Sequence, residues 1–279
     1  MAPNSPISST TMLAFVCLVL HLTNTYASLS NAKTIIILAG QSNMSGRGGV
    51  QNNTWDGVVP LQSQPNPLIL RLTANLTWVP AHEPLHTDID IHATCGVGPG
   101  MSFANSVLQR HPGLGPLGLV PCAVGGPMGT KISEWGKRRF LYKQVLMSAK
   151  AARKNGGSVR GVLWFQGESD TVSEVDARKY KRRLVNLFSN LRADLGDPLL
   201  PIVHVAITSG QGPYIETVRK AQLGIKLQNV KCVDAKGLPL LQDKLHLSTP
   251  AQVRLGQMLA DAFLMQEHVA SSSDNTSSP

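Results

Sequence analysis

The segment Thr34–Leu38 (TIIIL), followed by Ala39-Gly40-Gln41-Ser42, most constrains how this chain can fold. An apolar, β-branched run without polar alternation predicts a strand covered on both faces, as in a parallel sheet. Gly40 permits a sharp exit from that strand. Open α/β sheets bind ligands beyond the carboxyl ends of their strands, so Ser42 is predicted at a functional edge. An ordinary helix cap is the alternative role for this serine.

Further apolar runs alternate with amphipathic segments along the chain. Strands are predicted at 117–124, 159–165, 201–207 and 230–234, with shorter ones near 68–72 and 76–79. Helices are predicted at 98–111, 137–154, 173–195, 215–227 and 249–267. Strands that alternate with helices favour a parallel sheet with helices on both faces. We therefore expect a three-layer α/β/α sandwich of the flavodoxin-like kind, with a mainly parallel sheet of about five strands.

Composition favours one large domain. The chain has 279 residues, of which 42% are hydrophobic and 15% charged, enough for one sizeable core. The net charge is +9, but the basic residues are scattered and their longest cluster, Lys137–Arg139, is short. A nucleic-acid partner is therefore not expected, whereas a polyanionic surface such as an acidic polysaccharide would suit this charge. We expect a monomer.

The amino-terminal segment predicts export. Met12–Leu22 is apolar but too short to span a bilayer comfortably, and small residues precede a cleavage position after Ala27. We expect a signal peptide at 1–27, a catalytic domain at 28–268 and a disordered polar tail at 269–279. The protein would then be secreted, to the extracellular space or the cell wall, without further membrane contact. An uncleaved anchor is the alternative, because no Lys or Arg precedes the apolar run.

Cysteine and glycosylation patterns agree with export without settling it. An odd number of cysteines follows the predicted signal (Cys95, Cys122 and Cys232), so at most one disulfide can form and its pairing stays open. Glycosylation sequons begin at Asn52, Asn75 and Asn275. Asn43 begins a fourth, but a glycan there would block the predicted site.

Polar clusters follow three of the predicted strands, at Gly40–Ser42, Gly125-Gly126 and Gln166–Ser169, and a fourth, Asp243–Ser248, lies just before the last predicted helix. The carboxyl ends of parallel strands meet at one edge, which brings these clusters together. A serine nucleophile needs a base and a group that orients the base. Asp243 and His246, three residues apart, can supply that pair for Ser42.

Ester cleavage also needs hydrogen-bond donors where the oxyanion develops. We expect three: the backbone N–H of Ser42, that of a glycine in Gly125-Gly126, and the side-chain amide of Gln166. A glycine suits the second position because the main chain must approach the substrate without a Cβ in the way.

These residues carry a resemblance to a known superfamily. Gly40–Met44 (GQSNM), Trp164–Asp170 (WFQGESD) and Asp243–His246 (DKLH), in this order, resemble the SGNH (GDSL-type) hydrolases. Within that superfamily they are most similar to the plant carbohydrate esterases related to sialate O-acetylesterases (the SASA domain). The resemblance covers about residues 35–264. It implies an α/β/α fold and metal-free ester hydrolysis, with deacetylation of carbohydrate as the expected reaction.

The resemblance also implies residue roles. The nucleophile falls on Ser42, the base on His246, the orienting acid on Asp243, and the oxyanion glycine on Gly126 with Gly125 as its less favoured neighbour. The superfamily commonly has an Asn donor where this chain has Gln166, so Gln166 takes that role. Ser169 is the runner-up and Glu168 a supporting residue. A Thr is expected directly after the glycine pair, so Pro127-Met128 resembles an insertion; proline lacks an N–H, and activity would be lowered if that position supplies a donor.

Some of these residues also suggest other roles. Glu168 and Asp170 suggest a paired-carboxylate glycosidase, but they lie two residues apart in one loop without a second acidic partner. Asp88–His92 (DIDIH) has metal-binding side chains, yet one short run supplies few constrained ligands and a surface loop is favoured. Trp135 could stack on a sugar, although a core position is commoner. No metal or cofactor is implied.

We therefore expect a serine esterase that hydrolyses O-acetyl esters of an oligo- or polysaccharide through an acyl-enzyme on Ser42. Acyl transfer to sugar hydroxyls and a non-catalytic carbohydrate-binding protein on the same scaffold are the alternatives.

Overall fold

The structure is a computed structural model that describes residues 32–126, 128–154 and 156–274, and the side chains up to residue 266. The predicted signal peptide at 1–27 and the sequon at Asn275 lie outside the described residues. The last helix continues to Asp274, through part of the segment predicted as a tail.

A seven-stranded sheet forms the centre of the molecule, in the order β5-β4-β6-β1-β7-β8-β9. Its strands are β1 (Lys33–Gly40), β4 (Ile69–Leu72), β5 (Trp78–Pro80), β6 (Leu117–Pro121), β7 (Gly157–Phe165), β8 (Ile202–Ala206) and β9 (Val230–Asp234). Neighbours pair in parallel except β4 and β5, which form an antiparallel edge. The expected count of about five strands was wrong, because the two short strands near 68–72 and 76–79 join this sheet through β6.

Pro121 ends β6 without loss of a ladder hydrogen bond. On one side it lies opposite Leu38 of β1, and the next N–H, that of Cys122, donates to the Leu38 carbonyl at 2.8 Å. Successive residues of a strand direct their N–H groups to opposite sides, so the N–H that proline lacks would point towards β4. The pairing with β4 has already ended there, at Arg71 opposite Leu119. The proline is therefore tolerated inside the sheet.

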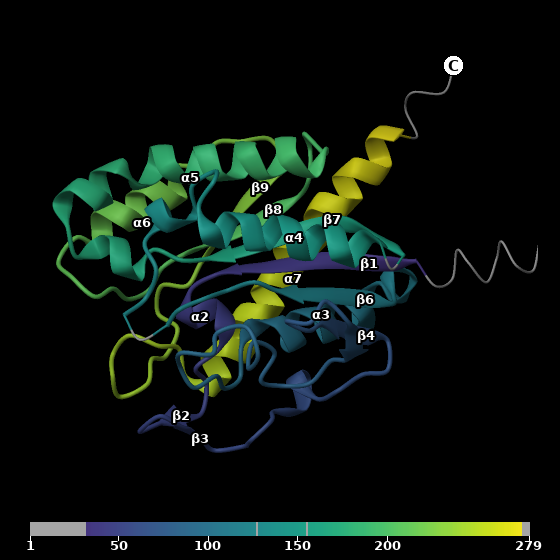
Figure 1. Ribbon diagram of the computed structural model, residues 1–279, viewed down its shortest axis with the longest axis horizontal. Helices are drawn as coiled ribbons and strands as arrows, with labels where there is room; N and C mark the ends of the chain where they lie inside the picture. Colours follow the sequence, from purple (N-terminus) through teal and green to yellow (C-terminus); the bar gives the residue numbers. More distant parts are fainter. Residues whose placement is uncertain (1–31, 127, 155, 275–279) are drawn as a thin grey trace, which may run out of the picture.

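Helices cover both faces of the sheet (Figure 1). The helices are α2 (Ser42–Ser45), α3 (Pro99–Arg110), α4 (Phe140–Lys154), α5 (Glu174–Leu195), α6 (Ile215–Leu223) and α7 (Thr249–Asp274). In Figure 1, α4, α5 and α6 lie above the edge-on sheet and α3 lies below it; α7 packs on α3 and runs past the sheet, so that its end lies above the sheet in this view. Four short 3₁₀ turns (Leu61–Ser63, Pro112–Leu114, Ile132–Trp135 and Glu168–Thr171) and a hairpin of β2 (Val50–Gln51) and β3 (Thr54–Trp55) complete the fold. The expected three-layer α/β/α class is thus observed.

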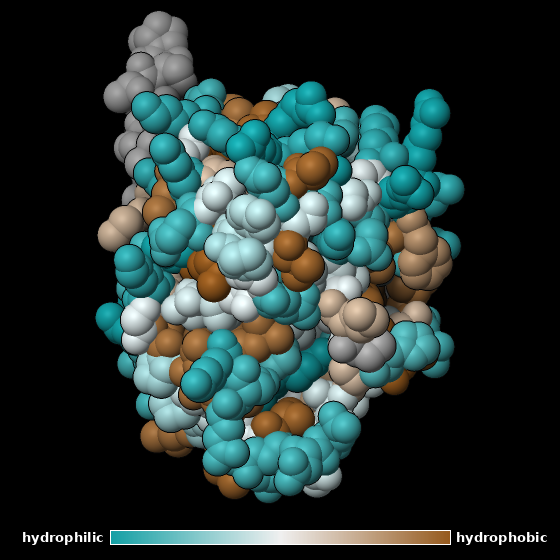
Figure 2. Space-filling model, turned by 90° about the vertical axis from the view of Figure 1, so that its left-hand side faces the viewer, coloured by the Kyte–Doolittle hydropathy of each residue, from teal (hydrophilic) through white to brown (hydrophobic). Residues whose placement is uncertain are grey.

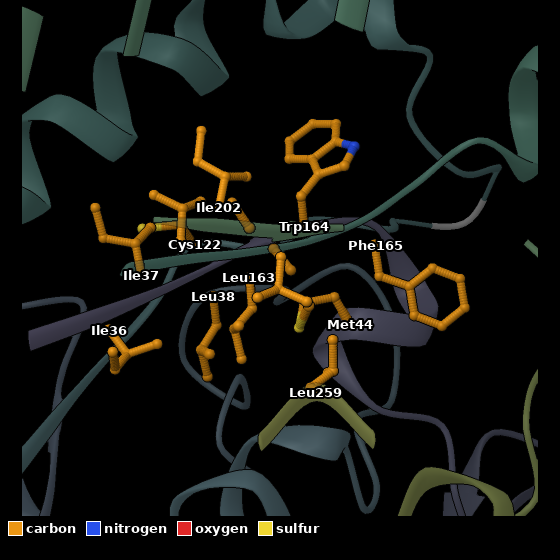
Figure 3. Packing of buried hydrophobic residues seen from close by; sticks show 14 of the residues in the cluster. Ile36, Ile37, Leu38, Met44, Cys122, Leu163, Trp164, Phe165, Ile202 and Leu259 are labelled. Atoms are coloured by element: carbon orange, nitrogen blue, oxygen red, sulfur yellow. The ribbon is translucent and has the colours of Figure 1, made fainter. Parts of the chain in front are cut away.

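The core explains why β1 carries an unbroken apolar run. Ile36 and Leu38 point to the α7 side, near Leu259, whereas Ile37 points to the side of Trp164 (Figure 3). All residues from Ile35 to Ala39 are fully buried, as a central strand between two helical layers requires. Trp135 packs edge-to-face on Trp164 and is 1% exposed, so it is a core residue without access to a ligand.

No described helix combines the length and the apolar character that a membrane span requires.

Gly40 sets the path from β1 to Ser42. Its φ is +134°, a region that residues with a Cβ rarely adopt, and an added Cβ would lie 2.0 Å from the carbonyl oxygen of Phe165. The next residue, Gln41, donates its N–H to that same carbonyl at 2.9 Å. The strand therefore turns against β7 at a distance that only glycine allows.

We predict that Gly40→Ala destabilises the protein by roughly 3 kcal/mol or more, because backbone strain and a clash with β7 coincide. Gly196, at the end of α5, is the matched control: its φ is +73° but open space surrounds it. Gly196→Ala should lower the free energy of unfolding by only about 1–2 kcal/mol. Urea unfolding of both variants measures the difference, and equal losses would contradict the proposed clash.

Candidate active site

Three side chains from opposite ends of the chain meet beyond the carboxyl end of β1. Ser42 is the first residue of α2, and His246 and Asp243 lie in the loop before α7. The Oγ of Ser42 lies 2.9 Å from Nε2 of His246, and Nδ1 of His246 lies 2.7 Å from Oδ2 of Asp243. Because a carboxylate only accepts, Nδ1 carries the ring proton and Nε2 is left to accept from the Ser42 hydroxyl. This is the geometry of a nucleophile, a base and an orienting acid.

The loop of residues 243–246 is preorganised by its own carboxylate. Oδ1 of Asp243 accepts the backbone N–H groups of Leu245 and His246 at 2.9 and 3.0 Å. Lys244, which directly follows Asp243, has a left-handed φ of +54°. The turn thus leaves Oδ2 free for the imidazole.

Burial and hydrogen bonding set the charges of this pair. Burial lowers the pKa of His246 below 6.5, and the hydrogen bond and charge of Asp243 only partly offset this. Burial alone would raise the pKa of Asp243, but the N–H groups of His246 and Leu245 and the imidazole hold it below its usual value. At neutral pH the imidazole is therefore neutral, as a general base requires, beside an ionised carboxylate.

A cleft of about 770 Å³ opens onto these residues. Ser42, Asp243 and His246 line it together with the β2–β3 hairpin, residues 91–94 and Gly126. Figure 2 looks onto this face of the molecule, where hydrophobic and hydrophilic side chains are interspersed. The volume lies within the range usual for small-molecule sites.

Asn43 ties the nucleophile turn to the histidine loop, a role that sequence reasoning missed. Its Nδ2 donates to the Leu245 carbonyl at 3.3 Å, and its Oδ1 accepts the N–H of Leu247 at 2.9 Å. These two residues flank His246. Nδ2 also donates to Oε1 of Glu168 at 2.7 Å. Asn43 is fully buried, so its sequon is inaccessible to a glycan.

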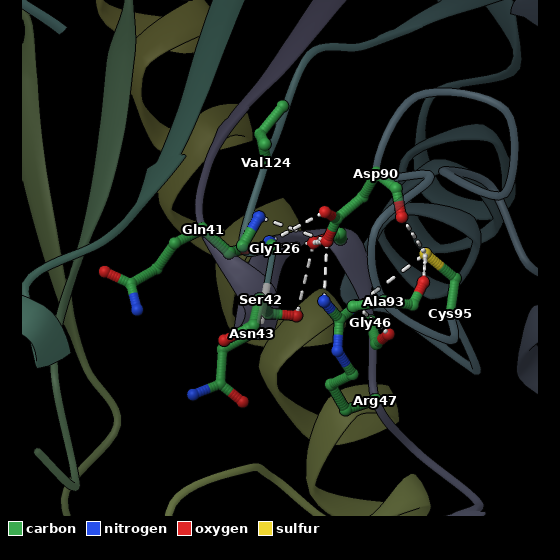
Figure 4. Close-up of polar contacts among 12 residues, drawn as sticks. Gln41, Ser42, Asn43, Gly46, Arg47, Asp90, Ala93, Cys95, Val124 and Gly126 are labelled. Atoms are coloured by element: carbon green, nitrogen blue, oxygen red, sulfur yellow. Dashed lines mark hydrogen bonds and ion pairs between the residues drawn. The ribbon is translucent and has the colours of Figure 1, made fainter. Parts of the chain in front are cut away.

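Asp90 fixes the glycine loop beside Ser42, and this contact was also missed. Its two carboxylate oxygens accept the N–H groups of Gly125 and Gly126 at 3.1 and 2.8 Å (Figure 4). Oδ2 further accepts from Ser45 and pairs with Arg47 at 2.6 Å. Burial alone would raise the pKa of Asp90, but the charge and hydrogen bond of Arg47 and the glycine N–H keep it low.

The segment 88–92 is a loop, as predicted, but Asp90 within it is buried. Asp90 is 1% exposed, and the exposed residues of the segment are Ile91 and His92. Within the described residues, no group of three His, Cys, Asp or Glu side chains is placed to hold a metal ion. The partner of Asp90, Arg47, is 5% exposed, and because the sequence does not show that burial, it gave no signal for this ion pair.

The predicted oxyanion donors are not equally placed. Both N–H groups of the Gln166 amide are used inside the protein, by the Thr130 carbonyl at 2.7 Å and Oδ2 of Asp170 at 2.6 Å. Gln166 is fully buried and does not line the cleft, so its assignment as a donor to substrate is corrected. The N–H of Gly126 is held by Asp90. Of the three predicted donors, the Ser42 N–H is the one that has no hydrogen-bond acceptor within the described part of the chain. It is therefore available to the substrate.

The remaining predicted residues lie around the site and outside the catalytic triad. Ser169 accepts a long contact of 3.5 Å from the Gln41 amide. The missing Cβ of Gly125 allows its close approach to Ser42, since an added one would lie 2.7 Å from the Ser42 Cβ. Glu168 and Asp170 are 1% and 0% exposed and lie outside the cleft. A paired-carboxylate glycosidase needs both acids at the substrate, so this alternative is not supported.

The three described cysteines are free thiols. Burial raises the pKa of Cys95 to about 11 and that of Cys122 and Cys232 to about 12, which leaves them unreactive at neutral pH.

A serine, a histidine and an aspartate at the carboxyl edge of a parallel sheet are an arrangement typical of α/β hydrolytic enzymes. A family model described as carbohydrate esterase, sialic acid-specific acetylesterase matches residues 32–265. The chain belongs to this family, as the sequence motifs predicted, and is thereby a carboxylic ester hydrolase.

Individual relatives agree. A probable carbohydrate esterase of Arabidopsis thaliana is 54% identical over 237 residues, which cover 82% of this chain and 90% of the relative. The X-ray structure of an Arabidopsis thaliana protein has a TM-score of 0.80 at 52% identity, and the match covers 84% of this chain and 98% of that one. The crystal structure of NanS matches with a TM-score of 0.67 at 19% identity, over 85% and 98% of the two chains. At that identity the likeness to NanS shows the fold alone.

We predict that kcat/KM of the esterase rises with pH along a limb whose midpoint lies below 6.5, because the base is active only when neutral. Asp243→Asn removes the charge that raises the pKa of His246, so the midpoint should fall further and the rate should drop by about 10⁴-fold. A pH series on a small acetyl ester measures both. A midpoint above 6.5, or an upward shift in the variant, would contradict the assigned base.

We predict that Asn43→Ala lowers kcat by about a hundredfold, because the loop that carries His246 loses its anchors on both sides. Ser209→Ala is the matched control: the Ser209 hydroxyl donates to the same Leu245 carbonyl at 2.6 Å but holds only that side of the loop. Ser209→Ala should lower kcat by less than tenfold. Rates are compared below the melting temperature of each variant; an unchanged kcat in folded Asn43→Ala would refute the anchoring role.

Proposed function

We propose that this protein hydrolyses O-acetyl esters of carbohydrate through an acyl-enzyme on Ser42. The single observation that carries the proposal is the hydrogen-bond chain from Ser42 through His246 to Asp243, open to the cleft. Membership of the carbohydrate esterase family and the name of the Arabidopsis thaliana relative support an acetylated carbohydrate as substrate.

The proposed reaction follows the geometry. His246 Nε2 takes the hydroxyl proton as Ser42 Oγ attacks the acetyl carbonyl carbon. The tetrahedral intermediate places its negative oxygen near the Ser42 N–H, and the imidazolium is stabilised by Asp243. The C–O bond to the sugar breaks, and His246 returns the proton to the departing sugar oxygen. Water then attacks the acetyl-enzyme by the same path and releases acetate.

We further propose that the enzyme acts as a secreted protein. The apolar segment at 12–22 and the cleavage position after Ala27 support export. Asn75, which begins one of the sequons, is exposed in the structure, as a glycan acceptor requires, whereas Asn52, which begins another, is exposed but lines the catalytic cleft.

We predict that Ser42→Ala and His246→Ala each lower the hydrolysis of p-nitrophenyl acetate by about 10⁴-fold or more, because nucleophile and base act as a unit. Released acetate from acetylated sugars gives the second readout. Ser63→Ala is the matched control, since Ser63 is a fully buried serine that does not line the cleft.

The control variant should keep the parent rate. A parent enzyme no faster than Ser42→Ala would overturn the proposed function and favour a carbohydrate-binding protein on the same scaffold. A loss below tenfold in His246→Ala would refute the assigned base.

A further inference from the structure

A second hollow lies beside the catalytic cleft. It has a volume of about 390 Å³ and lies between the 88–92 segment, the end of β6 and the amino-terminal half of α4. The predicted mechanism uses none of its side chains.

The two spaces share a wall. Ile91 and His92 line both the catalytic cleft and the second hollow. The residue before them, Asp90, is anchored to Gly125 and Gly126 beside Ser42. A substrate bound at Ser42 can therefore continue over these two side chains into the second hollow.

The lining of the second hollow combines exposed apolar surface with hydrogen-bonding groups. Phe140 and Ile91 are 70% and 68% exposed, although large apolar side chains usually gain by burial. His92, Gln144 and Asp88 contribute polar atoms to the same lining.

This combination fits a sugar better than an acyl chain. A pyranose ring offers an apolar C–H face, which can pack on an aromatic ring, and hydroxyl groups along its edge. Asp88 is already paired with Arg71 and the Ala74 N–H, but a purely aliphatic or aromatic acyl group would cover His92 and Gln144 without offering them hydrogen bonds, which costs free energy.

We propose that the second hollow is a subsite for a neighbouring sugar residue of an oligo- or polysaccharide substrate, with Phe140 as its packing surface. The inference rests on the proposed function and deepens it: the enzyme would act on acetylated chains in preference to single acetylated sugars.

Substrate length tests the subsite. Acetylated oligosaccharides of one to four residues, in xylose, mannose and galacturonic acid series, are compared by kcat/KM. We expect a gain with chain length in at least one series, and Phe140→Ala should reduce that gain by about five- to tenfold, the order that one aromatic contact contributes. Phe140→Trp should restore it. The rate on p-nitrophenyl acetate, which is too small to reach the hollow, should follow the parent in both variants.

Leu199→Ala is the matched control, because Leu199 is a 48% exposed apolar residue just before the amino end of β8, remote from the cleft. It should leave the length dependence intact. Binding of the unacetylated tetrasaccharides to Ser42→Ala by calorimetry gives a readout that needs no catalysis. We expect that binding to be lost in Ser42→Ala combined with Phe140→Ala.

Absence of a length effect in all three series, or a gain that survives Phe140→Ala, would overturn the subsite. So would a Phe140 effect that follows the size of the acyl group instead of the length of the sugar chain. Failure of the proposed function itself would be recognised separately, by p-nitrophenyl acetate hydrolysis that does not depend on Ser42.

Discussion

The side-chain amide of Asn43 is the contact on which the catalytic arrangement depends. It is fully buried, directly follows Ser42, and binds the backbone on both sides of His246. Unpaired buried amides are costly, so the folded state is favoured only when this loop is in place. The nucleophile Ser42 and the base His246 are 204 residues apart in the sequence. The loop of His246 is held beside Ser42 because Oδ1 of this buried amide accepts the Leu247 N–H, and its Nδ2 donates to the Leu245 carbonyl as well as to Glu168.

Asp90 performs the equivalent task on the other side of Ser42. A buried carboxylate without partners would be strongly destabilising, and here Ser45, Arg47 and two glycine N–H groups supply the partners. The same contacts decide the shape of the substrate site. Because Asp90 points inward, the next two residues of its segment point outward and become the wall between the cleft and the second hollow.

The sequence predicted those features that depend on local pattern. The unbroken apolar run of β1 predicts a strand that is covered on both faces of a parallel sheet. In such a sheet the polar residues that follow the strands lie at one edge. Features that depend on loop closure could not be found this way. Asp90 binds Gly125 and Gly126, which follow it by 35 and 36 residues, and nothing in the sequence around Asp90 indicates this contact. Gln166 illustrates the same limit, since a polar residue after a strand looks alike whether its amide faces the cleft or the core. The short strands β4 and β5 were located, but their membership of the sheet depends on β6.

The segment Gln166–Asp170 carries the most specific motif of the chain, and its polar side chains point inward. Gln166 holds the Thr130 carbonyl, on the segment that follows the glycine loop, and Glu168 holds Asn43, beside the nucleophile. Burial raises the pKa of Glu168 to about 7 and that of Asp170 to about 6. Raised pKa values often mark catalytic acids, but here neither group reaches the cleft, so burial in a structural network is the sufficient cause. The motif is therefore explained by position: Gln166 holds the segment after the glycine loop, and Glu168 holds the turn that carries the nucleophile.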